Sequence, residues 1–119
     1  YDAARASFLD YMDDLTDAGR AAVRTEQQRV SALLVHEIDP ATGQKYLYTA
    51  ARFPASFEAA LLSFHSRATD AEKAHVRLLG NSVFDRKAAP MEGVGALLRD
   101  LKQAGYKLII LTKGERWVQ

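Results

Sequence analysis

An uninterrupted apolar stretch near the C-terminal end constrains this chain more than any other feature. Residues 108–111 read Leu-Ile-Ile-Leu, and glycines stand on either side at Gly105 and Gly114. Because apolar residues do not alternate with polar ones, the segment 106–112 predicts a β-strand buried on both faces, as in a parallel sheet covered by helices. A lone buried strand leaves unpaired N–H and C=O groups on both edges, each costing about 1–3 kcal/mol. Either the segment is not a strand, or its partners come from outside these 119 residues.

Most of the remaining chain has helical periodicity. Four successive amphipathic helices are expected before residue 85, separated by capping and turn residues. Asp2 is the expected N-cap of a helix over 2–16 and Asp17 of a second, and a third helix is expected from about Pro54, since proline suits the first helical turn. Thr69 begins the fourth through a Thr-x-x-Glu capping box. The expected apolar faces contain Tyr1, Phe8, Met12 and Leu15, then Val23, Val30, Leu33 and Leu34, then Phe57, Leu61 and Phe64, and finally Val76, Leu79 and Val83.

A fifth helix leads directly into the expected strand. Its apolar residues, which are Val94, Leu97, Leu98 and Leu101, follow helical spacing, and Gly105 stands where a C′ glycine belongs. Thr112 then falls at the carboxyl end of a parallel strand, which is the ligand-binding edge of an open α/β sheet. Gly114 allows a sharp turn, and a helix starting near residue 115 directs free N–H groups at an anion. This combination predicts a cradle for a phosphoryl group, in which Lys113 is equally well explained as an anion contact or as a solvated side chain.

Composition excludes several classes of protein. There is no cysteine, which excludes a disulfide framework, a thiolate zinc site and a cysteine nucleophile, and fits a cytoplasmic protein. Sixteen Lys and Arg oppose fifteen Asp and Glu, so neither nucleic acid nor a membrane is an expected partner. No apolar run approaches the roughly 20 residues of a membrane span, and no leader peptide is recognisable. Since Tyr1 stands where a natural chain has Met, we expect these residues to begin inside a longer sequence.

The run from Pro90 to Gln119 resembles the second motif of the haloacid dehalogenase (HAD)-like hydrolases. The residues that carry the resemblance are Pro90-Met91-Glu92-Gly93-Val94, Leu98, Leu101, Gly105-Tyr106-Lys107-Leu108, Leu111-Thr112-Lys113-Gly114 and Gln119. The resemblance implies an α/β fold with a Rossmann-type core and a helical cap. The implied domains are the cap over residues 1–85 and part of the core over 86–119. The chain itself is therefore expected to be mostly α-helical, with one or a few core strands.

The family's chemistry assigns roles to the residues of this motif. Thr112 is the implied catalytic residue, since its hydroxyl would bind an oxygen of the transferring phosphoryl group, and Lys113 and Gly114 join it in binding substrate. The implied activity is that of a Mg²⁺-dependent phosphatase acting on a small phosphate ester, in which an Asp carboxylate attacks phosphorus and water hydrolyses the aspartyl-phosphate. A minority of the family cleaves carbon–halogen bonds, and the sequence does not separate the two reactions.

Three of the family's four motifs are not found in the chain. It contains no Asp-x-Asp, and the family's third-motif Lys and metal-binding acidic pair would follow Gln119. The nucleophile and the Mg²⁺ ligands are therefore expected outside these residues, and the fragment alone is expected to be inactive. The alternative function is a non-catalytic helical interaction or regulatory module whose terminal strand pairs with a partner.

Two further sets of residues are candidates for the site. His36, His65 and His75 lack the spacing of an established metal site, so they are expected at the surface or in the packing of the cap. Arg52, Arg67 and Arg77 would be able to reach a substrate from the cap, although a solvated charged face explains each of them more simply.

Overall fold

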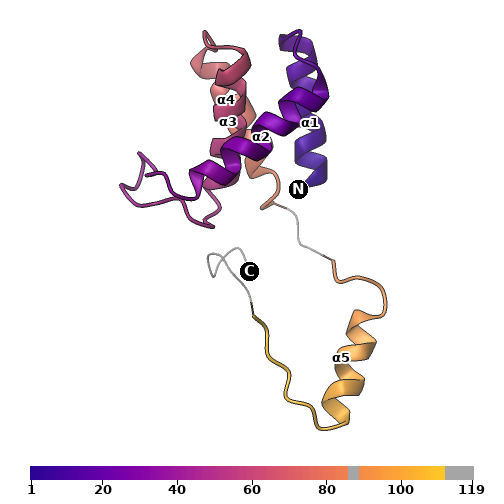
Figure 1. Ribbon diagram of the computed structural model, residues 1–119. Coiled ribbons are helices and arrows are strands. Elements are labelled where there is room, and N and C mark those ends of the chain that lie inside the picture. Colours follow the sequence, from indigo (N-terminus) through magenta and orange to yellow (C-terminus); the bar gives the residue numbers. More distant parts are fainter. Residues whose placement is uncertain (86–88, 112–119) are drawn as a thin grey trace.

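The computed structural model describes residues 1–85 and 89–111 of the chain. Within these ranges the regular elements are five α-helices, as drawn in Figure 1: α1 (Asp2–Leu15), α2 (Arg20–Leu34), α3 (Arg52–Phe64), α4 (Asp70–Asn81) and α5 (Val94–Gln103). The described residues contain no strand beyond an isolated antiparallel bridge between Ile38 and Lys45. The expected mainly helical character is therefore confirmed, whereas no Rossmann-type core is present in the described part.

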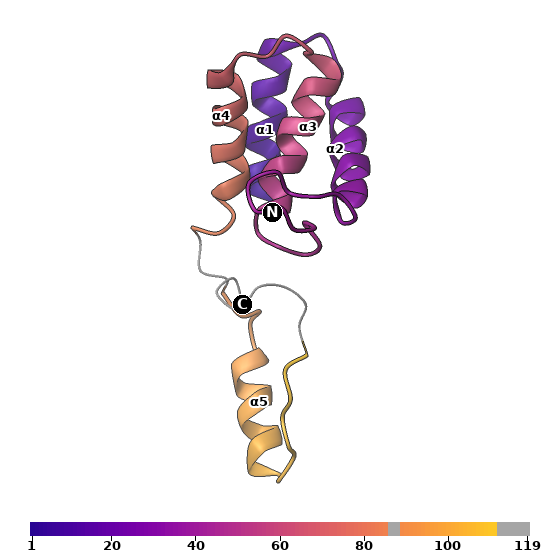
Figure 2. The ribbon, with the colours of Figure 1, turned by 90° about the vertical axis from the view of Figure 1, so that its left-hand side faces the viewer.

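The first four helices form an antiparallel bundle. Helix α1 packs beside α2 and α4, and α3 packs beside the same two helices. The turns 16–19 and 65–69 lie together at one end of the bundle in both views (Figures 1 and 2). The N-terminus, the long α2–α3 connection over 35–51 and the segment 82–85 lie at the opposite end, which we call the bundle base. The chain thus enters and leaves the bundle at its base.

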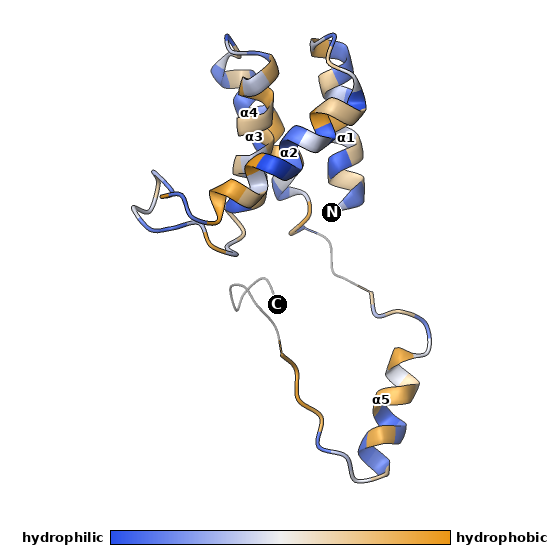
Figure 3. Ribbon diagram, in the orientation of Figure 1, coloured by the Kyte–Doolittle hydropathy of each residue, from blue (hydrophilic) through white to orange (hydrophobic). Residues whose placement is uncertain are grey.

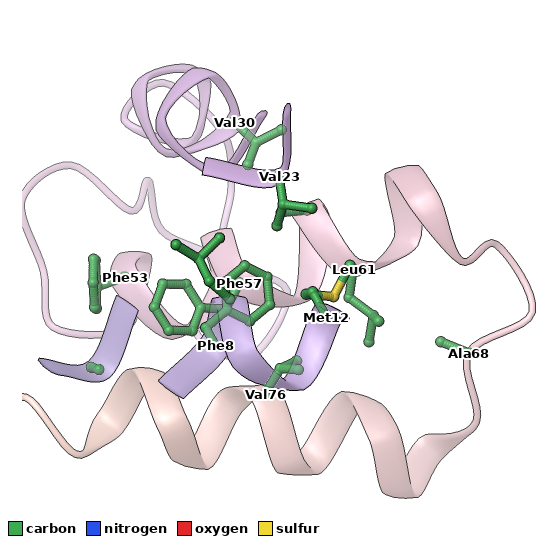
Figure 4. Close-up of a cluster of buried hydrophobic side chains, with 12 residues drawn as sticks. Phe8, Met12, Val23, Val30, Phe53, Phe57, Leu61, Ala68 and Val76 are labelled. Carbon is green, nitrogen blue, oxygen red and sulfur yellow. The ribbon is translucent and has the colours of Figure 1, made fainter. Parts of the chain in front are cut away.

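A continuous apolar core lies between these helices (Figure 4). Phe8 of α1 and Phe57 of α3 stack across the bundle, with ring centroids 4.3 Å apart and an interplanar angle of 17°. Both side chains are fully buried, and so are those of Met12, Val23, Leu61 and Val76. Since burying one such side chain stabilises a fold by about 1.5–3 kcal/mol, this cluster is the main source of the bundle's stability.

The close approach of α3 and α4 depends on a glycine. A Cβ atom added to Gly80 of α4 would lie 2.6 Å from the Pro54 Cα atom and 2.9 Å from its Cβ atom, both in the first turn of α3. Carbon atoms pack at about 3.5–4.0 Å, so no larger residue fits without separating the two helices. The pair therefore sets the distance between α3 and α4 close to the bundle base.

The helix ends agree only in part with the sequence expectations. The Thr69 capping box is confirmed, with the Glu72 N–H donating to Thr69 Oγ1 and the Thr69 N–H donating to the Glu72 carboxylate. Asp2 is not an N-cap, because Tyr1 occupies that position and the Asp2 carboxylate instead accepts a hydrogen bond from Arg5. The expected cap at Asp17 is also wrong, whereas Pro54 lies in the first turn of the third helix, as expected.

Both helices begin close to the expected residues. Helix α2 starts at Arg20, with Gly19 as its N-cap, and α3 starts at Arg52, two residues before the expected proline. A proline fits anywhere in a first turn, where N–H groups have no intrahelical acceptor, so it marks that turn without fixing its first residue. Leu33 was expected on the apolar face of α2, but its side chain is 53% exposed because α2 runs past the core there.

Helix α5 and the residues after it stand apart from the bundle in Figures 1 and 2, and α5 has no buried residue. The expected strand is wrong for the described residues, since 106–111 are extended but unpaired. The physical reason is the one that makes a lone strand unfavourable: no second strand among the described residues lies alongside to pair its N–H and C=O groups. No helix in the described ranges has the length and apolar character required to cross a membrane.

Candidate functional site

The three residues expected to bind a phosphoryl group, Thr112, Lys113 and Gly114, lie outside the described residues, as does Gln119. The structure describes the approach to them. Helix α5 ends in a Schellman motif, in which Gly105 has a φ of +87° and its N–H donates to the Lys102 carbonyl oxygen over 3.1 Å. The Tyr106 N–H donates to the Leu101 carbonyl oxygen over 3.0 Å, which completes the motif. The expected C′ glycine is therefore confirmed.

The segment that follows presents apolar side chains to solvent. Ile109 is 77% exposed, Ile110 91% and Leu111 98%, and the hydropathy colouring of Figure 3 shows this stretch as a continuous apolar run. On α5, Leu97 and Leu98 are exposed as well. Monomeric proteins rarely expose contiguous apolar surface of this kind unless it contacts another element or molecule. The residues that precede Thr112 thus have the composition of a protein interior, although no other element of the described residues buries them.

The acidic residues of α1 have a structural explanation. Arg20 Nη1 donates to Asp10 Oδ1 and to Asp13 Oδ2, each over 2.6 Å, and links the start of α2 to α1. These hydrogen bonds raise the pKa of Arg20 above its usual value. Because the carboxylates lie on a helix and are paired with a guanidinium, they do not resemble a nucleophile at a strand end.

The three histidines likewise take part in packing or lie at the surface. The ring of His75 lies 4.5 Å from that of Tyr11, His65 Nε2 is 3.8 Å from Glu72 Oε2, and His36 is exposed. The described residues contain no group of three or more His, Asp or Glu side chains that would hold a metal ion. Magnesium binds through carboxylates in near-octahedral geometry, so these ranges do not fit the Mg²⁺ that the family resemblance implies.

The α2–α3 connection at the bundle base contains a compact turn around Asp39. Its carboxylate accepts hydrogen bonds from the Ala41 N–H over 3.0 Å and from the Thr42 hydroxyl over 3.2 Å, which forms an Asx turn. It also accepts a hydrogen bond from the Tyr46 hydroxyl. Tyr46 is 5% exposed, and burial, followed by the charge of Asp39, raises the pKa of its phenol. The turn is therefore fixed to the bundle through a buried aromatic ring.

Strain and an exposed aromatic ring follow immediately. Leu47 has a φ of +45°, a left-handed conformation that few non-glycine residues adopt, and is held by a hydrogen bond from its N–H to the Val35 carbonyl oxygen. Tyr48 is 51% exposed, and the Arg52 guanidinium carbon lies 5.1 Å from the centre of its ring. The residue in the left-handed conformation thus directly precedes the aromatic residue that contacts Arg52.

The structure distinguishes Arg52, Arg67 and Arg77, which are equivalent candidates in the sequence. Arg67 lies in the 65–69 turn, at the end of the bundle opposite the base. Arg77 Nε donates to the Glu58 carboxylate, which joins α4 to α3. Arg52 lies at the base, and no carboxylate of the described residues forms an ion pair with it. Its one hydrogen bond in this part of the chain is a 3.5 Å contact from Nη1 to the Ser31 carbonyl oxygen.

Two features of this site were not expected from the sequence. The contact between Arg52 and Tyr48 had a weak indication in the sequence, which is an aromatic residue four positions before an arginine. Because the conformation of the loop between them is not predictable from local patterns, the contact was not expected. The left-handed conformation of Leu47 had no signal, because leucine seldom adopts it. In the comparisons with known proteins, no family model, no curated protein and no solved structure matches this chain.

Proposed function

We propose that this chain is the helical cap and part of the core of a HAD-like hydrolase, a Mg²⁺-dependent phosphatase acting on a small phosphate ester. The observation that carries the proposal is the arrangement around Gly105. An amphipathic helix ends in a Schellman motif and delivers an unpaired apolar segment, 106–111, directly to Thr112. That order of elements is the one expected before a phosphate-binding strand end, and the helical bundle over residues 1–85 is consistent with a cap.

The exposed apolar surface supports the assignment of 89–111 to a larger core. Ile109, Ile110 and Leu111 are almost fully exposed, and each would gain about 1.5–3 kcal/mol from burial. In a parallel sheet their backbone groups would pair with neighbouring strands, and α5 would cover one face with Leu97 and Leu98. A parallel sheet covered by helices would therefore account for both the exposed face of α5 and the unpaired segment 106–111.

The gene that encodes these residues should also encode the family's three other motifs. A strand ending in Asp-x-Asp should precede Tyr1, and a Lys and then an acidic pair should follow Gln119, because the family's chemistry requires all three. Sequencing across both ends of the region tests this. A natural reading frame that extends beyond both ends but contains no Asp-x-Asp before residue 1 would refute the phosphatase assignment.

Three substitutions at Thr112 test its role in the natural polypeptide that contains residues 1–119. Removing a hydrogen bond to a charged group costs about 1.5–3 kcal/mol, so Thr112→Ala and Thr112→Val should lower kcat about 10- to 100-fold with p-nitrophenyl phosphate. Thr112→Ser keeps the hydroxyl and should recover most of the rate. Equal kcat for the Val, Ser and parent proteins would show that Thr112 is only structural.

The same exposed surface supports one other function, a non-catalytic interaction module whose segment 106–111 adds a strand to a partner's sheet. The two functions differ in what happens in the natural polypeptide. For the phosphatase, 106–111 are protected from amide hydrogen exchange without a partner, because the sheet belongs to the same molecule. For the interaction module, these amides exchange rapidly until a partner protein is added.

A further inference from the structure

The topology of the bundle determines which of its surfaces faces the rest of the protein. Both chain connections, at Tyr1 and at the segment 82–85, emerge at the bundle base (Figures 1 and 2). In an antiparallel bundle of four helices, the connection between the second and third helices must lie at that same end. Any domain joined through both connections therefore lies closer to residues 35–51 than to the turns at 16–19 and 65–69.

The base also carries Arg52, whose hydrogen-bonding capacity is largely unused within the described residues. A guanidinium group has five N–H donors in a plane, and Arg52 uses one of them in a 3.5 Å contact, at the long end of the hydrogen-bond range. The donors lie along the edge of the guanidinium plane, and the group's other contact is a cation–π contact, with its carbon 5.1 Å from the centre of the Tyr48 ring. That edge matches the two oxygens of a carboxylate or a phosphate.

The side chain is also held in place. The Tyr48 ring lies 5.1 Å from the guanidinium carbon, and Tyr48 directly follows Leu47, whose φ is +45°. Residues kept in such a conformation are found where surrounding structure requires a particular geometry, often beside a ligand. A solvent-exposed arginine without a ligand requires neither the contact with the Tyr48 ring nor the left-handed residue that precedes Tyr48.

We propose that Arg52 is a specificity-determining residue that binds a second anionic group of the substrate, with Tyr48 as its positioning residue. This inference rests on the proposed function, because it needs a catalytic core on the far side of the base. The substrate class is then a phosphate ester whose alcohol part carries a carboxylate or another phosphate. The ester phosphate is held by the core, and the second anion is bound by Arg52.

The test uses the natural polypeptide that contains residues 1–119 and three series of substrates. The first series is n-alkyl phosphates with two to six carbons, the second carries a terminal carboxylate on the same chains, and the third carries a terminal phosphate. We expect that at one or more chain lengths the charged esters have a kcat/KM about 10-fold or more above the neutral ester of equal length, from two charge-assisted hydrogen bonds. Comparing the second and third series identifies the anion.

The variants show whether Arg52 causes the preference. Arg52→Met should raise KM for the charged esters about 10- to 100-fold, with kcat little changed, and leave the n-alkyl esters unaffected, which also controls for folding. Arg52→Lys should recover part of the loss, since it keeps the charge without the planar fork. The matched control Arg67→Met, at the other end of the bundle, should leave kcat/KM unchanged for all three series.

Each other outcome is decisive in a different way. Hydrolysis without a preference for charged esters at any chain length would overturn the role of Arg52, and so would equal effects of Arg52→Met on the neutral and the charged esters. In both cases the phosphatase activity itself would still be supported. No hydrolysis of any ester would overturn the proposed function and this inference together.

Discussion

Replacing Gly80 by alanine tests the packing that holds α3 against α4. The new Cβ atom would lie 2.6 Å from Pro54 Cα, 2.9 Å from Pro54 Cβ and 3.1 Å from Pro54 N. The first of these is about 1 Å inside the distance at which carbon atoms pack. Two of the three atoms belong to the backbone of α3, so no side-chain rotation relieves the contact and the helices must separate.

Two opposing terms determine the size of the effect. Alanine in a helix is favoured over glycine by about 1 kcal/mol. Overpacking a well-packed contact costs about 1–3 kcal/mol, and the upper end applies when backbone must move. We therefore expect the free energy of unfolding to fall by about 2 kcal/mol, and the midpoint of thermal unfolding by about 10 °C for a bundle of this size.

The assay is urea unfolding of the 119-residue chain, followed by far-UV circular dichroism, with Gly19→Ala as the control. Gly19 has no atom within 4 Å of an added Cβ, so this second Gly→Ala change meets no steric contact and should cost less than about 1 kcal/mol, the loss expected for alanine at the N-cap of α2. If Gly80→Ala were as stable as the parent or more stable, the helix-propensity term would have prevailed and the close contact would not limit the distance between the helices.

Three further changes test other parts of the bundle. Ser56→Ala should lower the free energy of unfolding by about 1–3 kcal/mol, because the buried Gln27 Nε2 loses its 2.8 Å hydrogen bond. Adding Gln27→Leu should recover part of that loss in a double-mutant cycle measured by urea unfolding, and strictly additive effects would contradict the interaction. Thr69→Ala should cost about 1 kcal/mol in thermal unfolding while Thr69→Ser costs little, and equal losses would count against the capping box. Hydrogen bonds from Arg29 and Ser63 lower the pKa of Glu26 from 4.5 to about 2, so Glu26 stabilises the fold above pH 4.5 and this contribution is lost as the pH falls through 2. Glu26→Gln should flatten the acid-unfolding profile over that window by less than about 1 kcal/mol, as surface pairs do, and an unchanged profile would contradict the assignment.

The helices of the bundle could be predicted from sequence because their signals are local. Apolar residues at helical spacing identified α1 to α5, and the Thr69 capping box and the C′ position of Gly105 are confirmed. Helix starts were less predictable. Several residues near Asp17 and Pro54 satisfy the same local rules, and packing decides among them: α2 begins where Arg20 reaches Asp10 and Asp13.

The arrangement at the bundle base depends on contacts between distant parts of the sequence. Asp39 and Tyr46 are hydrogen-bonded across a turn, and Gln27 of α2 reaches Ser56 of α3. Periodicity reports which face of a helix is apolar, but it does not report which polar side chain meets which. For that reason Arg52, Arg67 and Arg77 could not be distinguished before their neighbours were known. The expected phosphate-binding residues, Thr112 to Gly114, stay a prediction, since they lie outside the described residues.

The unformed strand shows the limit of a pattern that is local in sequence but requires non-local partners. Ordering the backbone of residues 106–111 costs about 6–12 kcal/mol at 1–2 kcal/mol per residue. Burying Ile109, Ile110 and Leu111 would return about 5–9 kcal/mol, which on its own roughly offsets that cost. A strand here therefore becomes favourable only when neighbouring strands add ladder hydrogen bonds and helices cover both faces. The Leu-Ile-Ile-Leu pattern predicts the environment that the segment needs, and the described residues do not supply it, since Ile110 and Leu111 are more than 90% exposed.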